Sequence, residues 1–370
     1  MTTSKVLHFT EDPIVDNGIE RYEEHEYEPI NGTNLNSSGE IRINIEQQDL
    51  FTLPSKARIT YQLSNQVIEA VYYPGQATTM LGMLNYANDF QLAQGLNQLW
   101  YKDATSTAVL ADNTGFATRQ AYLIQKPTTK GTFSFCVPLR HIFGFCDDYD
   151  KIIYGVKHTI TLVRQSDDNA IFRLAAAAAG KVNLNKISLF MPNLTPSDKE
   201  TYELIKKIER KVTIPTSPEN PRYVIVGFQT NRSTGDQTVN ASIFDHCDLK
   251  NMYIMLNNNY RYPAVDFNLS FPNQQISRIY REAFVFKEKF YGMNELIANS
   301  NISPSDYRDL YPLFVFDISK QSERLKSSTI QVQIRATFNT AVPANTQAYA
   351  LVLSDRMMEL QSDGNKLNAI

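Results

Sequence analysis

Cysteine and histidine are scarce in this chain of 370 residues, and there is no excess of positive charge. Its three cysteines, Cys136, Cys146 and Cys247, are too few for a disulfide framework and fit a reducing compartment. The formal net charge of −3 gives no basic field, so direct or sequence-specific binding of nucleic acid is not expected. The composition therefore excludes a disulfide-stapled secreted domain and a basic nucleic-acid-binding protein.

Long apolar runs are missing as well. The N-terminal stretch MTTSKVLHFTEDPIVDNG has no apolar core of the kind that a secretory signal needs. No run approaches the ~20 apolar residues of a membrane span. The sequence predicts a protein made without a secretory signal and without a transmembrane segment.

Catalytic motifs are also absent. The chain has no GxSxG elbow, phosphate-binding P-loop or GxGxxG turn. His246 and Cys247 are adjacent, but neighbouring side chains on an extended backbone diverge, so a Cys/His nucleophile is not expected. We predict no enzyme activity, no catalytic residues and no cofactor.

The best metal-binding candidate consists of Cys136, His141 and Cys146. Zinc sites usually take ligand pairs about two to four residues apart, which these are not. Buried thiols and a hydrogen-bonded histidine are the preferred interpretation, and no metal is expected. The acidic stretch DDYD at 147–150 lacks the spacing of a calcium-binding loop and is interpreted as a solvated turn.

Aromatic residues, in contrast, are abundant. The sequence has 20 Tyr and 20 Phe within a hydrophobic content of 42%, which supports packed cores and argues against disorder. Its length exceeds one ordinary domain, so two domains that meet near the middle are expected. Aromatic and β-branched residues between Asn, Ser and Thr favour strands and turns.

Alternation of apolar and polar residues predicts strands in the first half at 41–45, 58–63, 67–73, 133–137, 152–163 and 186–191. Helical spacing predicts one helix over Leu84–Trp100. The alanine run at 175–179 fits either a helical turn or a small-residue loop.

The segment LTPSDKETYELIKKIERK predicts a helix with Ser197 or Asp198 as its N-cap. With the proline-rich stretch after it, this helix is the expected boundary, which divides the chain into 1–196, 197–221 and 222–370. The second half then predicts strands at 223–228, 252–256, 313–319, 330–338 and 347–354, and a helix at 284–298. Because both halves share one order of elements, residues 40–192 and 222–354 are expected to superpose as duplicated sandwiches.

Several long segments carry a family resemblance. They are PRYVIVGFQT, FDHCDLKNMYIMLNNNYRYP and YPLFVFDISKQSERLK in the second half, with SGEIRINIEQQDLFTLPSK and CVPLRHIFGFCDDYDKIIYG in the first. Together they resemble the double jelly-roll major capsid proteins of small eukaryotic DNA viruses, the adintovirus or polinton-like proteins and their relatives integrated in invertebrate genomes. Between IERKVTIP and PRYVIVGFQT, such proteins carry a longer insert than the TSPEN found here, which bears on how many strands the second jelly roll keeps.

This resemblance implies an all-β fold of two tandem eight-stranded jelly-roll β-sandwiches with short helices in the loops. It also implies a structural major capsid protein in the virion, a homotrimer that forms pseudo-hexameric capsomers and tiles an icosahedral shell. Neighbouring capsomers and penton or minor capsid proteins would be its partners.

Aromatic residues in long loops are too numerous to stay solvated, so Phe286, Phe290 and Tyr291 are candidates for subunit contacts. Two other functions remain open for a β-sandwich. One is a carbohydrate-binding, lectin-like protein. The other is a cupin-type metalloenzyme, which the lack of clustered histidines disfavours.

Overall fold

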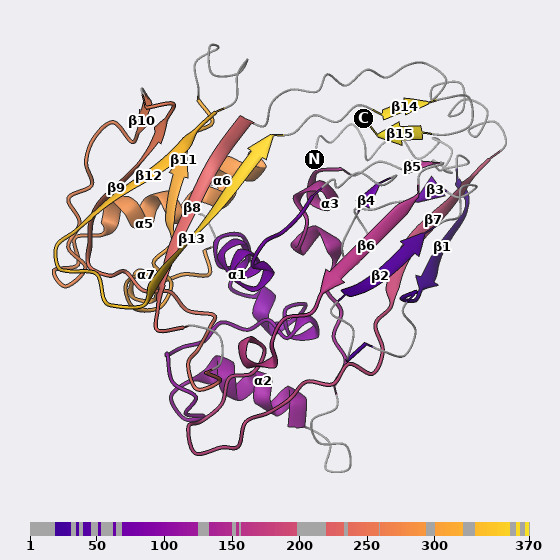
Figure 1. The fold of residues 1–370 in the computed structure, drawn as a ribbon, viewed down its shortest axis with the longest axis horizontal. Coiled ribbons are helices and arrows are strands. Elements are labelled where there is room, and N and C mark those ends of the chain that lie inside the picture. The colour runs from indigo at the N-terminus through magenta and orange to yellow at the C-terminus, as the bar shows by residue number, and fades with distance from the viewer. Residues whose placement is uncertain are drawn as a thin grey trace, which may run out of the picture.

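The structure is a computed structural model. It describes residues 19–30, 35–36, 40–45, 51–52, 62–63, 69–124, 133–149, 153–154, 157–197, 220–232, 236–258, 260–293, 300–320, 330–355, 360–362 and 367–369. Figure 1 shows one group of strands at each end of the molecule, with helices between them.

The first half builds two antiparallel sheets. The order of one is β1-β7-β3-β5, from Ile19–Tyr27 (β1), Phe51–Thr52 (β3), Ile153–Tyr154 (β5) and Leu189–Pro196 (β7). The order of the other is β2-β6-β4, from Glu40–Ile45 (β2), Gln62–Leu63 (β4) and His158–Val163 (β6). The three isoleucines of β2 stand at alternate positions, and all of them are buried, as the period-2 pattern predicts.

The described helical elements of the first half all come after β4 in the chain. They are Pro74–Asn85 (α1), Thr114–Ile124 (α2) and Gly144–Asp148 (α3), with 3-10 turns at Phe90–Leu92, Leu96–Gln98, Leu139–His141 and Asp167–Asn169. Proline at the first turn of α1 suits that position, because its missing N–H has no partner in a helix there.

The second half also builds two antiparallel sheets, with three strands each. The order of one is β11-β8-β13, from Asn220–Thr230 (β8), Phe314–Asp317 (β11) and Thr346–Asp355 (β13). The order of the other is β10-β9-β12, from Leu249–Leu256 (β9), Tyr260–Tyr262 (β10) and Val332–Phe338 (β12). The short strands Leu360–Ser362 (β14) and Leu367–Ala369 (β15) pair with each other.

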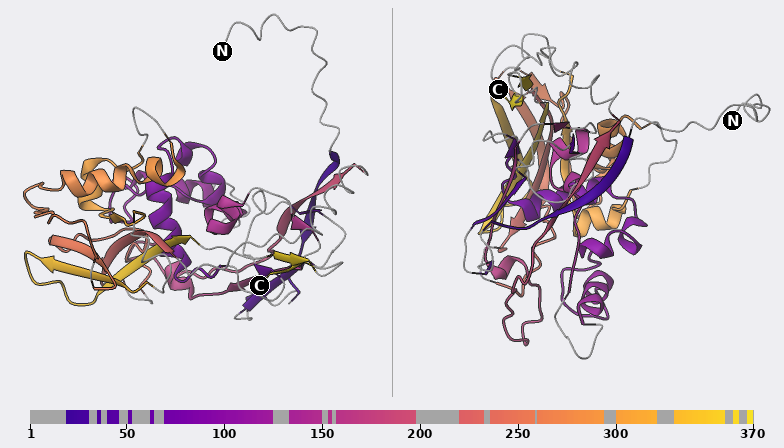
Figure 2. Two further views of the ribbon diagram at one scale, coloured as in Figure 1. Left: turned by 90° about the horizontal axis from the view of Figure 1, so that it is seen from above. Right: turned by 90° about the vertical axis from the view of Figure 1, so that its right-hand side faces the viewer.

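Three helices belong to the second half: Ser277–Phe284 (α5), Phe286–Tyr291 (α6) and Pro304–Asp309 (α7). Ser303 and Asp306 close a reciprocal capping box at the start of α7. In the left view of Figure 2 the helices lie on one side of the strands of this half.

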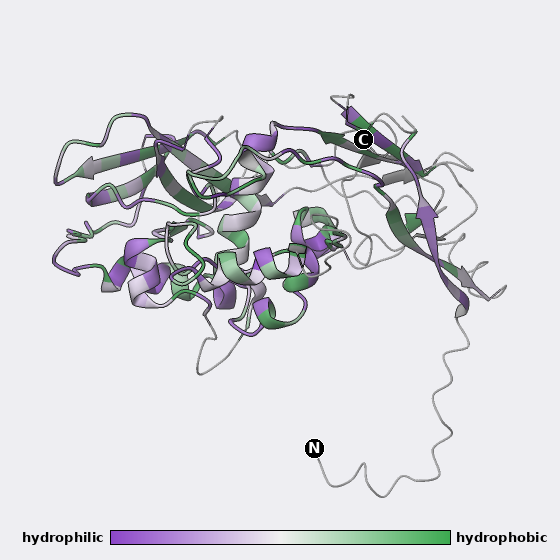
Figure 3. Cartoon of the chain, turned by 90° about the horizontal axis from the view of Figure 1, so that it is seen from below, coloured by the Kyte–Doolittle hydropathy of each residue, from purple (hydrophilic) through white to green (hydrophobic). Residues whose placement is uncertain are grey.

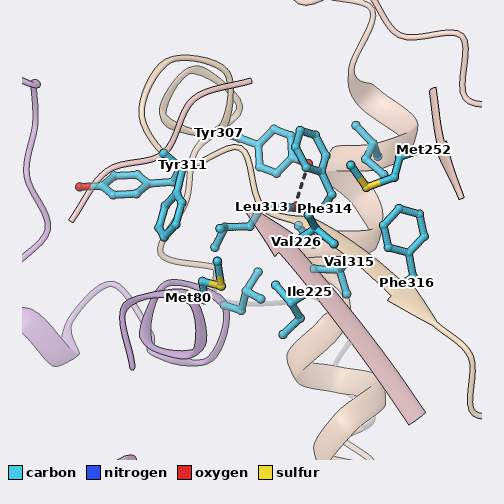
Figure 4. Close-up of a cluster of buried hydrophobic side chains, with 14 of the residues drawn as sticks. Met80, Ile225, Val226, Met252, Tyr307, Tyr311, Leu313, Phe314, Val315 and Phe316 are labelled. Atoms are coloured by element: carbon cyan, nitrogen blue, oxygen red, sulfur yellow. Dashed lines mark hydrogen bonds between the residues drawn. The ribbon is translucent and has the colours of Figure 1, made fainter. Parts of the chain in front are cut away.

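The larger core belongs to the second half, around β8. This strand is buried on both faces, as its continuous apolar run predicts. Figure 4 shows Ile225 and Val226 of β8 among Met252, Phe314 and Phe316. The hydroxyl of Tyr307, which is fully buried, donates to the carbonyl of Leu313 at 2.9 Å. Figure 3 shows hydrophobic segments within the strands of both halves and in the helices between them.

Several predicted boundaries were wrong. The helix expected over Leu84–Trp100 instead starts at Pro74, ends at Asn85 and is followed by two 3-10 turns. Leu99 has a left-handed backbone, which no helix continues through.

The expected strand at 133–137 is irregular, with Phe133 and Phe135 exposed, because no other described strand pairs with it. Residues 69–73 form no strand, and the rest of the strands expected at 58–63 and 67–73 falls outside the described residues except for β4.

The remaining predicted elements fall close to their expected places. The alanine run at 175–179 begins with a short turn and continues as irregular chain, so of the two alternatives, a helical turn or a small-residue loop, the loop is the one observed. The expected helix after residue 196 lies outside the described residues, and its first letters, LTP, end β7. The helix expected at 284–298 was too long: α6 covers Phe286–Tyr291 and ends at Gly292, which has a left-handed backbone, and residues 294–299 lie outside the described range.

Candidate functional site: the junction between the two halves

Helix α1 comes from the first half of the chain but packs into the core of the second half. Met80, Met83 and Leu84 belong to one buried cluster with the residues of β8 and β9. A Cβ atom on Gly227 of β8 would meet Phe244 at 2.7 Å and the methyl group of Met80 at 2.9 Å. Because this position has no side chain, the end of Met80 packs directly against the strand, so the two halves share a close-packed contact.

A buried carboxylate forms the polar centre of this junction. Asp103 is 1% exposed, and its Oδ1 lies 2.7 Å from Nη2 of Arg119. Its Oδ2 accepts hydrogen bonds from Asn240 at 2.7 Å and from Ser242 at 3.1 Å. Since Asn240 and Ser242 belong to the second half, one carboxylate ties the halves together.

The backbone of Asp103 also forms hydrogen bonds with the second half. Its N–H donates to the hydroxyl of Tyr311 at 3.0 Å, and this hydroxyl donates to the carbonyl of Asp103 at 3.0 Å. Tyr311 is fully buried. Both carboxylate oxygens of Asp103 and its backbone N–H and carbonyl therefore have partners, as a buried charge requires.

A second ion pair reinforces the contact. Nζ of Lys102 lies 2.7 Å from Oδ2 of Asp306 and donates to the carbonyl of Asn301 at 2.7 Å. The side chain of Lys102 is 15% exposed, so solvent screens this pair less than a surface pair. Consecutive residues 102 and 103 therefore fasten the helical segment of the first half to the second half.

Carboxylates gather at the other end of the junction, around α3. The Tyr291 hydroxyl donates to Asp147 at 2.8 Å, and Arg140 also pairs with Asp147 at 3.0 Å. Glu69 accepts hydrogen bonds from the N–H groups of residues 144 and 145 at the start of α3. Burial raises the pKa of Glu69. Burial also raises the pKa of Asp148, and repulsion from Asp147 and Asp355 adds to this shift.

The sequence predicts no metal site at Cys136, His141 and Cys146, and the structure shows what surrounds His141 and Cys146. Nδ1 of His141 lies 3.1 Å from Oε1 of Gln98, which accepts a hydrogen bond when that nitrogen carries the proton, and burial lowers the pKa of His141 to about 4. Burial raises the pKa of the Cys146 thiol, which opposes formation of a thiolate. Among the described residues, no group of three or more His, Cys, Asp or Glu side chains could hold a metal ion.

His246 and Cys247 have different partners. The ring of His246 stacks on Phe271 and accepts a hydrogen bond from the N–H of Asp248 at 2.8 Å. Cys247 is buried, with its Sγ 3.8 Å from the Thr230 hydroxyl, and desolvation raises its pKa. The two side chains are thus engaged separately, and burial disfavours the thiolate.

The three candidates for subunit contact lie on α6, not in a loop. Phe286 is fully buried and packs against Tyr223 at a ring distance of 5.2 Å, so its own chain already encloses it. This corrects the premise that its side chain is free to contact another subunit. Phe290 is partly buried against the same tyrosine, and Tyr291 is 41% exposed. Sequence reasoning found these aromatics but missed Asp103, whose partners are remote in the chain.

Comparison with known proteins now adds the family. The model of the double jelly roll-like domain matches residues 104–217 and 207–358, which span most of the chain. The chain therefore belongs to the double jelly roll-like family, which confirms the predicted all-β fold and, at the level of fold, the resemblance to double jelly-roll capsid proteins.

One solved structure similar to this chain is the crystal structure of the mavirus major capsid protein. It is 12% identical, with coverage of 97% of this chain and 90% of that chain and a TM-score of 0.39. The comparison with curated proteins gave no match. No helix in the described part of the chain is both long enough and apolar enough to cross a membrane.

Proposed function

We propose that this chain is a structural major capsid protein without enzymatic activity, located in the virion. The observation that carries the proposal is a double jelly-roll chain whose halves are joined through a buried junction at Asp103. Such a junction makes two sandwiches one rigid building block. A coat needs that rigidity, because each subunit must present the same faces to every neighbour.

The assembly that follows is a homotrimer. Three copies of a chain with two similar halves present six similar faces outward, and a near-hexagonal object can tile an icosahedral shell. We propose these trimers as pseudo-hexameric capsomers whose partners are neighbouring capsomers and penton or minor capsid proteins. The net charge of −3 agrees with a coat that leaves contact with the genome to other proteins.

Each jelly roll would follow the divisions proposed from the sequence: 1–196, a connecting segment at 197–221, and 222–370. Strand β8 begins at Asn220, two residues before the proposed start of the second unit, which supports a division near this point. Helix α1, although it lies in the first unit by sequence, packs with the second.

Light scattering and negative-stain microscopy of the purified full-length chain test the proposal. We expect the mass of three chains, particles with a near-hexagonal outline, and closed shells at higher concentration. A mass that stays at one chain over a wide concentration range contradicts it. Binding of glycans by such a stable monomer would instead support the lectin-like alternative.

A further inference from the structure

One segment of the second half is held by the first half as well as by its own. It comprises residues 236–243, between β8 and β9, and we name it the tongue. Its buried side chains are Gln237, Asn240 and Ile243. Within its own half, Nε2 of Gln229 on β8 donates to the carbonyls of Ala241 and Ile243, both at 2.9 Å. The tongue is therefore anchored to β8.

The first half holds the tongue at two places. The first is the buried carboxylate of Asp103, which accepts hydrogen bonds from Asn240 at 2.7 Å and from Ser242 at 3.1 Å. These are the bonds that join the two halves at the junction. The tongue is thus the part of the second half that the junction binds.

The second place is Gln237, which is inserted into a loop of the first half. Its Oε1 accepts hydrogen bonds from the N–H of Gly180 at 2.9 Å and from Nε of Arg173 at 3.2 Å. Its Nε2 donates to the carbonyl of Gly180 at 3.0 Å and to Asp168 at 3.1 Å. The backbone carbonyl of Gln237 accepts from the N–H of Arg173 at 2.9 Å. Both donors and both acceptor positions of the buried amide are used.

These contacts fix the alanine loop, by which we mean residues 174–179. Every residue of this loop is exposed, so hydrophobic packing contributes little to its order. Its carbonyls are held instead by the guanidinium of Arg173, which donates to Leu174, Ala175 and Ala177. A segment with few buried apolar contacts opens easily when its hydrogen bonds are lost. The loop therefore keeps its shape because Gln237 holds Arg173.

We propose that the tongue is a latch that keeps the alanine loop closed while the two halves are docked at Asp103. Gln237 and Asn240 belong to the same segment, so withdrawal of the tongue breaks the bonds to Asp103 and to the loop together. A buried amide that loses its partners is unfavourable, which disfavours a half-bonded state. When the halves separate, the loop opens, and a run of small residues becomes available to a protease.

Limited proteolysis of the full-length chain with elastase tests the latch, because the small specificity pocket of elastase accepts alanine. Gln237→Leu removes the side-chain hydrogen bonds of the latch and should increase cleavage within 174–179 at least ~10-fold, since cleavage follows the population of the open form. Asp103→Ala should increase cleavage at the same bonds and place the first cut there. Among described residues, the Asp103 carboxylate bonds to Arg119, Asn240 and Ser242 but to no residue of the loop.

Gln94→Leu is the matched control, because it makes the same substitution at an exposed glutamine and should leave cleavage at the wild-type rate. A wild-type rate in Gln237→Leu would show that Gln237 does not close the loop. If Asp103→Ala is cut first outside 174–179, the tongue does not connect the junction to the loop. Either result overturns the latch.

Hydrogen exchange of the wild-type chain gives a test that needs no variant to fold. The N–H groups of Arg173 and Gly180, which donate to Gln237, should open with the same free energy as the N–H of Asp103, which donates to Tyr311. Exchange at Arg173 and Gly180 that is much faster than at Asp103, after correction for intrinsic rates, would mean that the loop opens while the halves stay docked.

Discussion

The two halves of the molecule bury their apolar residues in different ways. In the first half, Ile43, Ile160 and Leu139 belong to a small cluster built from its own strands and turns. In the second half, β8 lies in a much larger cluster that also takes in Met80 and Met83 of α1. The second core is therefore completed by a helix that precedes it in the chain by more than a hundred residues.

This difference bears on how the halves depend on each other. A domain that owns its whole core can fold alone, whereas one that borrows a helix exposes apolar surface without it. Because α1 and Asp103 both belong to the first half, the second half is expected to be the dependent partner. The comparison can be tested by removing the shared contacts one at a time.

The largest effect is expected from Asp103→Ala. It leaves Arg119 and Asn240 without their partner in a buried site, which costs about 3–5 kcal/mol in the free energy of unfolding. Urea denaturation should also separate into two transitions. The only tryptophan, Trp100, packs against the larger core, so its fluorescence should change before the far-UV circular dichroism. Asp309→Ala, at a more exposed pair with Arg308, should change little. A single unshifted transition in Asp103→Ala would show that the halves are not coupled there.

Met80→Ala tests the apolar part of the same junction. Met80 is 1% exposed, and its truncation should lower the free energy of unfolding by about 2–4 kcal/mol through lost burial and a cavity. Met293→Ala is the control, since Met293 is 41% exposed and should be nearly neutral. Equal denaturation midpoints for the two variants would mean that α1 contributes nothing to the second core.

Local patterns predicted the strands better than the helices. Burial of β2 was indicated directly by the alternation of Ile41, Ile43 and Ile45. Burial of β8 was indicated by its unbroken apolar run. The helix was misplaced because leucine spacing between 84 and 100 resembles a helical face, although the chain there forms 3-10 turns. The better signal was Pro74, which fits the first turn of a helix.

The junction itself was beyond the reach of sequence patterns. Asp103 is separated from Asn240 by 137 residues and from Tyr311 by 208, and no spacing rule connects such positions. Burial of a carboxylate is also unexpected for an isolated residue, because it requires partners that only the folded chain supplies. The sequence around Asp103 therefore did not indicate that its carboxylate is buried at the junction.

Gly227→Ala sharpens the comparison with a smaller change. The added Cβ would lie 2.7 Å from the Phe244 ring and 2.9 Å from the methyl group of Met80, so these two side chains must move apart from β8. We expect a loss of about 1–3 kcal/mol in the free energy of unfolding from this overpacking. Gly75→Ala within α1 meets no atom within 4 Å and should be neutral or slightly stabilising. A neutral Gly227→Ala would argue that the contact between α1 and β8 is loose.

The smallest expected effect is a change in pH dependence at the carboxylate end of the junction. Burial raises the pKa of Glu69 above its ordinary value of 4.5, so the ionised carboxyl lowers stability at neutral pH. As the pH falls through the raised pKa, the native state takes up a proton that the unfolded chain does not yet hold, and stability increases. In Glu69→Gln this increase between neutral pH and 4.5 should be reduced, because glutamine does not titrate. Thermal midpoints of both proteins over that range measure the difference, and parallel curves would mean that Glu69 does not titrate within the fold.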